Sequence, residues 1–216
     1  MMSSKKVAVI GLGSIGKAVA QDLVKGGRSI IVASRKLEDA EKLAQELGSL
    51  ATPTDTESAI KEADILILSV WFNVEQELLK AHAADLAGKI IIDPSNPIVP
   101  DEKGGFKKII GETESSGEII AALITNNAKL VKAYGTLGAE TLSSAAFATP
   151  EKNVLFYATD DDSVDGDIET LIADSGFDAV KVGGINQSIR LEVFGDLNEF
   201  GALGKAVTKA EAQEKL

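Results

Sequence analysis

The chain contains no cysteine and a single histidine, His82. Without cysteine it forms no disulfide, thiolate metal site or cysteine nucleophile, which suits a reducing cytoplasm. Histidine is the side chain most often used for acid–base catalysis and metal binding, so one histidine leaves little room for either. His82 stands in an alanine-rich helical segment far from the expected ligand edge, and we expect it to be solvated. The sequence therefore predicts no catalytic side chain and no metal site.

Basic residues and long apolar runs are also scarce. Lysine and arginine number 22 against 33 acidic residues, and the net charge is −11. An acidic chain without a basic stripe is a poor ligand for nucleic acid or an anionic membrane surface. No run approaches the roughly 18 apolar residues of a membrane span, and residues 1–6 lead directly into a short strand rather than a signal peptide. We expect a cytoplasmic protein with small-molecule partners, and leave a homodimer open as its assembly.

Short apolar runs alternate with amphipathic stretches, the pattern of a parallel sheet wound with helices. The fold class predicted is α/β, a Rossmann-type doubly wound, mostly parallel sheet with a small C-terminal α/β lobe. Asp55 or Thr56 is the expected cap of the third helix. The predicted strands cover 6–10, 29–33, 64–69, 89–92 and 129–133. The predicted helices cover 14–26, 36–47, 56–62 and 74–86.

The second half of the chain begins with a polar, glycine-rich stretch over 98–117, which predicts a long loop. A helix near 117–126 follows, and after Pro150 two strands at 153–158 and 178–182 flank another helix. An amphipathic helix over 187–204 should bury Ile189, Leu191, Phe194, Leu197, Phe200 and Leu203. We predict a Rossmann domain over 1–149 and a lobe over 150–216 that extends the sheet and closes the cleft.

The first predicted strand runs into the motif Gly11-Leu12-Gly13-Ser14-Ile15-Gly16, a G-x-G-x-x-G that stands between a strand and a helix as a dinucleotide site requires. Gly11 permits the tight turn, Gly13 lets the backbone approach a pyrophosphate, and Gly16 lets the helix pack closely on the sheet. The N–H groups at the start of the helix then face the phosphates. The motif predicts a dinucleotide site.

The end of the second strand indicates which dinucleotide binds. An NAD site usually carries an acid there for the ribose 2′-hydroxyl, but this chain has Ser34-Arg35-Lys36. A carboxylate would repel a 2′-phosphate, whereas a hydroxyl and a guanidinium would bind it, and one charge-assisted hydrogen bond contributes roughly 1.5–3 kcal/mol. We predict NADP(H) as the cofactor. The alternative is that Arg35 and Lys36 only begin a solvated helix.

Three further segments follow predicted strands, at the edge where open α/β sheets bind ligands. The first holds Ser69, Val70 and Trp71, and Trp71 either walls the nicotinamide or is buried in a core or interface. The second, Asp93-Pro94-Ser95-Asn96-Pro97, is either a site or a plain turn. The third is Tyr134-Gly135-Thr136-Leu137-Gly138-Ala139. Hydride transfer between two redox cofactors needs mainly proximity and orientation. A sequence with few candidate acid–base side chains is therefore compatible with this reaction.

These segments, in this order, resemble the coenzyme F420-dependent NADP oxidoreductase family over nearly the whole chain. The motifs that carry the resemblance are Ala33-Ser34-Arg35, Ser69-Val70-Trp71, Asp93-Pro94-Ser95-Asn96-Pro97, Ala133-Tyr134-Gly135-Thr136-Leu137 and Ser188-Ile189-Arg190-Leu191-Glu192. The resemblance implies hydride transfer between NADPH and the deazaflavin F420 or a related flavin. It implies a pyrophosphate site at Leu12, Gly13, Ser14 and Ile15, and a nicotinamide site at Val70, Trp71, Asn96 and Ala139. It also implies that Thr136, Leu137 and Ser188 face the second substrate.

Two other functions stay open. The first is a reductase of a small imine or 2-oxo acid, as in other enzymes with this glycine pattern. The second is a non-catalytic NADP-sensing module.

Overall fold

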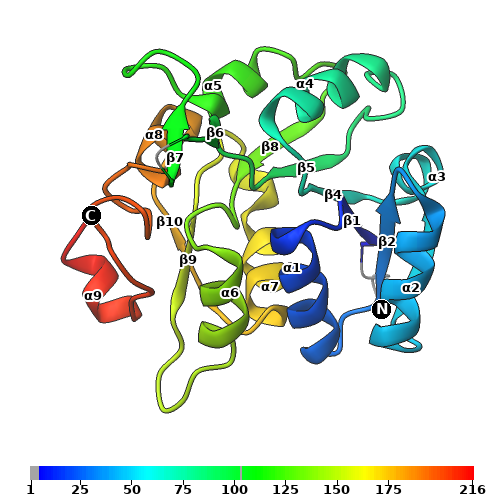
Figure 1. Ribbon diagram of the computed structural model, residues 1–216, viewed down its shortest axis with the longest axis horizontal. Coiled ribbons are helices and arrows are strands. Elements are labelled where there is room, and N and C mark those ends of the chain that lie inside the picture. The colour runs from blue at the N-terminus through cyan, green and yellow to red at the C-terminus, as the bar shows by residue number, and fades with distance from the viewer. Residues whose placement is uncertain (1–4, 103) are drawn as a thin grey trace.

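A six-stranded parallel sheet forms the centre of the computed structural model, which describes residues 5–102 and 104–216 (Figure 1). The strand order is β3-β2-β1-β4-β5-β8, and the reversal of direction beside β1 confirms the doubly wound α/β fold. The prediction that residues 1–6 hold no signal peptide falls mostly outside the described residues. The strands of this sheet are β1 (Val7–Ile10), β2 (Ile30–Ser34), β3 (Ala51–Asp55), β4 (Ile65–Leu68), β5 (Ile90–Asp93) and β8 (Lys129–Lys132).

Helices cover both faces of this sheet because alternate side chains of each strand point in opposite directions. Val7 and Val9 belong to the core beneath α1 (Ser14–Lys25), α2 (Leu37–Leu47), α6 (Ala139–Ala145) and α7 (Asp165–Asp174). Ala8 and Ile10 belong to the core beneath α3 (Thr56–Glu62), α4 (Phe72–Ala81) and α5 (Ser116–Ala121). Since each strand is buried on both faces, its sequence is apolar without alternation.

A second sheet of two parallel strands, β9 (Val154–Tyr157) and β10 (Asp178–Lys181), lies beside β8. An antiparallel bridge between Lys132 and Ala158 joins the two sheets. Leu155 and Tyr157 enter the core of the large sheet, while Val154 and Phe156 pack against the C-terminal segment. The domain boundary at residue 149 and the closing of a cleft stay predictions.

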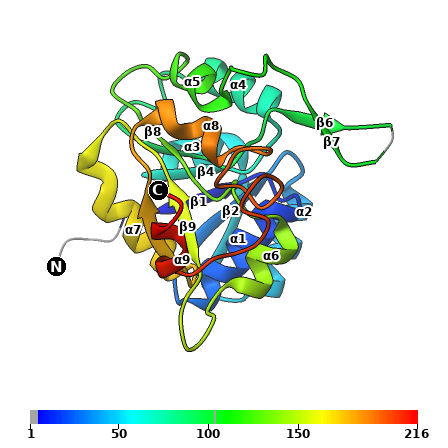
Figure 2. The same ribbon diagram turned by 90° about the vertical axis from the view of Figure 1, so that its left-hand side faces the viewer.

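Two predictions for irregular regions are corrected by the structure. Strand β3 was not expected, since its sequence Ala-Thr-Pro-Thr-Asp is polar and contains Pro53. It occupies the outer edge of the sheet, where a residue without an N–H is tolerated. The predicted loop over 98–117 contains an antiparallel hairpin of β6 (Ile98–Pro100) and β7 (Phe106–Lys108), which projects from the body in Figure 2.

The predicted helix over 187–204 is wrong over most of its length. Its start consists of a 3-10 turn (Ile185–Gln187) and α8 (Ser188–Leu191), and irregular chain follows until α9 (Lys209–Gln213). A side chain at Gly201 would start 1.9 Å from the carbonyl oxygen of Gly195, so the backbone folds tightly on itself. Phe194 and Phe200 are consequently exposed, at 55% and 50%, rather than buried. Leu191, Leu197 and Leu203 are buried as expected, and Ile189 is half-buried.

The remaining helix limits follow from local capping. Asp55, one of the two expected caps of α3, accepts a hydrogen bond from the Ser58 N–H at 2.9 Å. Helices α4 and α5 end earlier than the predicted limits of 86 and 126, and turns follow both.

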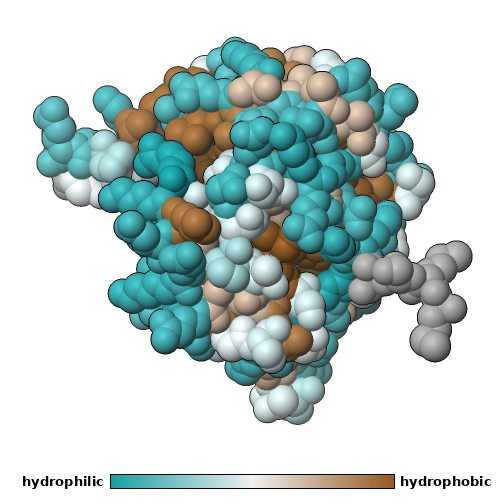
Figure 3. Space-filling view, turned by 90° about the vertical axis from the view of Figure 1, so that its right-hand side faces the viewer, coloured by the Kyte–Doolittle hydropathy of each residue, from teal (hydrophilic) through white to brown (hydrophobic). Residues whose placement is uncertain are grey.

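Among the described helices, none has the length and apolar character needed to cross a membrane. Seen from the side that carries α2, the surface is largely hydrophilic, with apolar patches between polar ones (Figure 3).

The buried carboxyl of Asp22 on α1 makes stability depend on pH. Burial raises its pKa from the usual 3.8 to about 7, and Lys25 opposes the shift. The folded protein therefore binds a proton that the unfolded chain has released, and stability falls as pH rises from about 4 to about 7. We expect Asp22→Asn to raise the free energy of unfolding at pH 8 by about 1–3 kcal/mol.

Urea unfolding at pH 4, 6 and 8 measures this effect, with the exposed Glu46→Gln as control. A gain of the same size at pH 4 and pH 8 would contradict the proposed cause, because at pH 4 the carboxyl is protonated in the folded state and about half protonated in the unfolded chain, so most of the penalty is absent.

Candidate nucleotide-binding site

Two glycines of the loop after β1 are required by close packing. Gly11 has a φ of +92°, and its N–H donates to the Ala33 carbonyl of β2 at 2.9 Å. A side chain at Gly11 would start 2.2 Å from the Ser69 carbonyl oxygen, and one at Gly16 would start 1.9 Å from the Gly11 carbonyl oxygen. Neither position has room for a β-carbon, so the loop, β2 and the end of β4 are held in one arrangement.

Gly13 differs from these two glycines because it faces open space. No atom lies within 4 Å of the point where its side chain would start, and its φ of −72° is ordinary. Gly13 is the N-cap of α1 and provides no side-chain cap. The first N–H groups of the helix therefore lie at an exposed edge, beside the exposed Ser14 and the half-buried Leu12 and Ile15. This is the arrangement in which a helix N-terminus receives an anion.

The end of β2 places two cationic side chains at the same edge. Arg35 and Lys36 are exposed, and the Ser34 hydroxyl accepts a hydrogen bond from the Lys36 N–H at 3.3 Å. Within the described residues, Arg35 makes no ion pair. Asp55 lies opposite Ser34 in the register of β3, but hydrogen bonds from Ser58 hold its carboxylate and keep its pKa below the usual value. The chain thus presents a hydroxyl and cations at the predicted 2′-phosphate position.

The end of β4 packs against the glycine loop. A side chain at Gly11 would start 2.6 Å from Cγ1 of Val70, and one at Gly16 would start 3.2 Å from Cβ of Ser69. Trp71 follows as the N-cap of α4 and is 57% exposed. Trp71 is therefore no core residue of this chain, and it stands at the open edge beside the glycine loop.

Asn96 joins the loops that follow β5 and β8 to the C-terminal segment. Its Nδ2 donates to the Gly135 carbonyl at 3.1 Å, and its Oδ1 accepts from the Val193 N–H at 2.7 Å. Asn198 donates to the same Gly135 carbonyl at 3.0 Å. A side chain at Gly135 would start 2.7 Å from the Pro94 carbonyl oxygen. The Nδ2 and Oδ1 groups of Asn96 thus hold these loops together. A contact between Asn96 and the nicotinamide stays a prediction.

The predicted second-substrate residues lie deeper than the cofactor residues. Thr136 and Leu137 are buried, and Ala139, the first residue of α6, is half-buried. Ser188 is fully buried, and its hydroxyl contacts that of Ser115 on the approach to α5. Ser188 therefore meets a substrate only if this contact opens, and the assignment stays a prediction.

The sequence-based reasoning missed a cluster of buried ionisable groups below the Pro94–Asn96 turn. Lys132 of β8 donates to the Asp93 carboxylate of β5 at 2.8 Å and to the Ser116 hydroxyl at 3.0 Å, and both charged side chains are at most 2% exposed. Glu75 of α4 is fully buried nearby. Its burial and the Asp93 carboxylate raise the pKa of Glu75 well above its usual value. Glu75 lies three residues after Phe72 and four before Leu79, so helical periodicity in the sequence could have predicted that it is buried.

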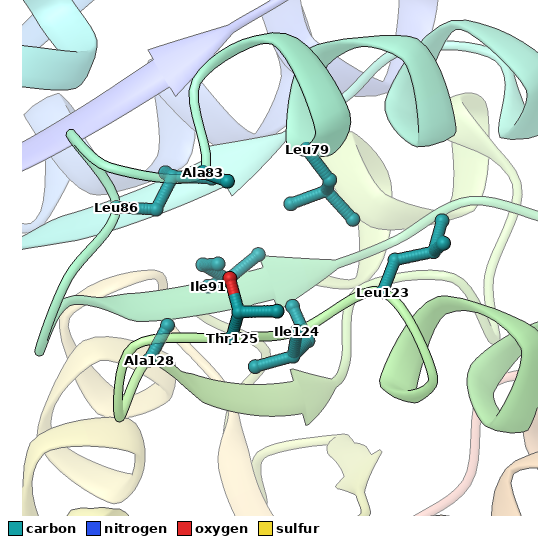
Figure 4. Close-up of a pocket in the computed structure, with 8 residues that line it drawn as sticks. All are labelled: Leu79, Ala83, Leu86, Ile91, Leu123, Ile124, Thr125 and Ala128. Atoms are coloured by element: carbon teal, nitrogen blue, oxygen red, sulfur yellow. The ribbon is translucent and has the colours of Figure 1, made fainter.

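Other candidate features lie away from this edge. Figure 4 shows an apolar recess between α4 and β5 in which Thr125 contributes the one hydroxyl, and such a lining offers nothing to hold a phosphate. His82 lies at the C-terminal end of α4, 3.7 Å from Asp85. Among the described residues, no group of three or more histidine, cysteine, aspartate or glutamate side chains could hold a metal ion.

The doubly wound sheet and the glycine loop at its carboxyl edge define the class of Rossmann-type dinucleotide-binding proteins. Residues 6–97 match the model of the family described as "NADP oxidoreductase coenzyme F420-dependent". The predicted family resemblance is confirmed there.

The metalloreductase STEAP3 of Rattus norvegicus is 30% identical over 139 residues, which are 64% of this chain and 26% of the relative. The glutamyl-tRNA reductase of Methanocaldococcus jannaschii is 40% identical over 99 residues, which are 44% of this chain and 25% of the relative. This chain therefore spans about a quarter of the length of either relative.

Two solved structures share the fold over most of their length. The hypothetical protein SMa0349 of Sinorhizobium meliloti has a TM-score of 0.82 at 24% identity, over 95% of this chain and 96% of that chain. A protein of Arthrobacter sp. FB24, described provisionally as an F420-dependent NADP reductase, has a TM-score of 0.71 at 23% identity, over 85% and 86%. At these identities the likeness concerns the fold.

The different surroundings of the glycines allow binding and folding to be separated. Gly13→Ala adds a methyl group where the ligand-free protein has open space, so we expect an unchanged melting temperature. The same methyl group would obstruct a pyrophosphate, and we expect NADPH affinity to fall at least about tenfold, or about 1.4 kcal/mol. Calorimetric titration and thermal unfolding measure the two effects.

Gly16→Ala is the matched control for the Gly13 variant. It should lower the melting temperature, because its methyl group would meet the backbone of Gly11. A Gly13→Ala protein that binds NADPH as wild type does would show that the cofactor lies elsewhere.

Proposed function

We propose that this chain is an NADPH-dependent oxidoreductase that transfers a hydride between NADPH and a flat, conjugated acceptor of the deazaflavin (F420) or flavin type. The family match over residues 6–97 supports the cofactor and the class of reaction. The open N-terminus of α1 and the exposed Arg35 support binding of the pyrophosphate and the 2′-phosphate.

One observation carries the choice of acceptor. The rings of Phe106 and Phe200 meet edge to face, with centroids 6.4 Å apart, and both are exposed. Phe200 also lies over Gly138, where a side chain would start 2.9 Å from its ring. The pair therefore borders the loop that leads to Ala139, at the sheet edge that also carries Trp71. Exposed aromatic faces of this kind stack with flat ring systems.

A small carboxylate substrate finds less support. Such a substrate is usually held by a bidentate arginine. Arg190, the arginine closest in sequence to the predicted substrate residue Ser188, is bound to the Asp196 carboxylate at 2.8 Å and to the Lys215 carbonyl at 3.0 Å. Its guanidinium is already engaged, so the geometry favours a ring that is held by stacking. A homodimer in the cytoplasm stays part of this proposal.

Arg35→Ala tests the preference between cofactors. We expect NADPH to bind wild type more tightly than NADH, and the substitution to narrow the difference by roughly 1–3 kcal/mol, since one charge-assisted bond to the 2′-phosphate is lost. Calorimetric titration with both cofactors measures this. The exposed Lys42→Ala on α2 is the control and should bind as wild type does. Equal wild-type affinities for NADPH and NADH would refute the cofactor assignment.

The acceptor is identified by steady-state oxidation of NADPH with F420, FMN, riboflavin and a panel of 2-oxo acids and cyclic imines. We expect a ring acceptor to have the highest kcat/KM, and Phe200→Ala to raise its KM about tenfold, because base-type stacking on an aromatic ring contributes roughly 1–3 kcal/mol. Ile109→Ala, an exposed apolar residue outside the aromatic pair, is the control. A higher kcat/KM for an imine or oxo acid supports the small-substrate alternative, and binding without turnover supports a sensor.

A further inference from the structure

The buried cluster below the Pro94–Asn96 turn holds more carboxyl groups than its single lysine can neutralise. Lys132 uses its three donors on the Asp93 carboxylate, the Ser95 carbonyl and the Ser116 hydroxyl. Asp93 uses its second oxygen to accept the Ser95 N–H at 2.6 Å. The ammonium and this carboxylate therefore balance each other, and any further carboxylate in the cluster needs its own compensation.

Two more carboxyl groups face this pair. Glu192, in the segment after α8, accepts from the Ser115 hydroxyl at 2.9 Å and the Gly117 N–H at 3.1 Å through one oxygen. Glu75, on α4, has no hydrogen-bond partner for either carboxyl oxygen among the described residues. Burying a carboxylate without partners costs far more free energy than burying a neutral carboxylic acid in the same place. Glu75 is thus the group of the cluster that holds a proton.

Ser95 lies close to Glu75 and next in sequence to Asn96, a predicted residue of the candidate site. Its hydroxyl is buried and, within the described part of the chain, has no partner of its own. It stands next to Asn96, in the turn at the carboxyl end of β5. Ser95 lies close enough to Glu75 to lower its pKa, as Lys132 does, while burial and Asp93 raise it. No bond of ordinary hydrogen-bond geometry joins the two groups here, so the hydroxyl or the carboxyl group has to move for a link to form.

We propose that Glu75, acting through the hydroxyl of Ser95, holds and transfers the proton that accompanies hydride transfer. This inference rests on the proposed function. Reduction of a flavin-type ring adds a hydride, which NADPH supplies, and one proton to a ring nitrogen. The O–H bond of Glu75 breaks, Ser95 accepts that proton and gives its own to the ring nitrogen, and water later reprotonates the Glu75 carboxylate. Glu75 is a positioning residue for the proton, and the buried Ser95 hydroxyl must become exposed at the carboxyl end of β5 to meet the acceptor.

The protonation state is tested on the ligand-free protein. Glu75→Gln keeps the size of the side chain and resembles the neutral acid, so the fold should survive. Infrared difference spectra between wild type and Glu75→Gln at neutral pH should show the carbonyl stretch of a protonated carboxylic acid. The exposed Glu77→Gln on the same helix should show only an ionised carboxylate. An ionised Glu75 at neutral pH overturns the inference.

The transfer is tested by turnover with the best ring acceptor. Wild-type kcat should fall as pH rises through the pKa of Glu75, and Glu75→Gln and Ser95→Ala should lower kcat about a hundredfold and lose this dependence. Their affinity for NADPH should be unchanged, and Glu77→Gln should behave as wild type. If wild type reduces the ring and Glu75→Gln matches it within threefold, the relay alone is overturned. If wild type reduces no ring acceptor, the proposed function itself is refuted, and the relay that rests on it is refuted with it.

Discussion

The loop after β1 packs so closely against the end of β4 and against the first turn of α1 that Gly11 and Gly16 have no room for a side chain. This contact sets the position of the loop relative to Ser69 and Val70, and the Gly11 N–H extends the arrangement to β2 through Ala33. The N-terminus of α1 is thereby held at the carboxyl edge of the sheet with its N–H groups uncovered. A rigid loop of this kind loses little entropy when an anion binds, so the packing constraint is also what prepares the phosphate site.

The other half of the edge depends on hydrogen bonds rather than on close packing. The segment after α8 gives up helical structure, and its groups bond instead to the loops that follow β5 and β8. The Glu199 N–H donates to the Thr136 carbonyl at 2.8 Å, and the Glu199 carboxylate accepts from the Gly138 N–H at 2.7 Å. These bonds bring Phe200 over Gly138. The exposed aromatic pair is therefore a consequence of how the C-terminal segment satisfies the backbone groups of this edge.

The buried cluster of Glu75, Asp93 and Lys132 has no evident benefit for stability alone. Buried ion pairs seldom repay the desolvation of both charges, and an apolar replacement of similar volume is often at least as stable. A neutral Glu75 without hydrogen-bond partners adds a further cost. Groups with strongly shifted pKa values collect at functional sites, and this cluster lies directly below the candidate site. Its position, more than its energy, connects it with function.

The sequence alone determined five of the six strands of the central sheet, the glycine loop and the cationic end of β2, because these depend on local patterns. Apolar runs without alternation report strands covered on both faces, and the motif reports a turn whose backbone only glycine adopts. The tertiary structure decided the rest. Pro53 lies in a strand because an edge position tolerates it, and residues 192–204 are irregular because distant loops bind their backbone. Glu75, Asp93 and Lys132, far apart in the sequence, form one cluster only because β5 and β8 end, and α4 begins, at the same edge of the sheet.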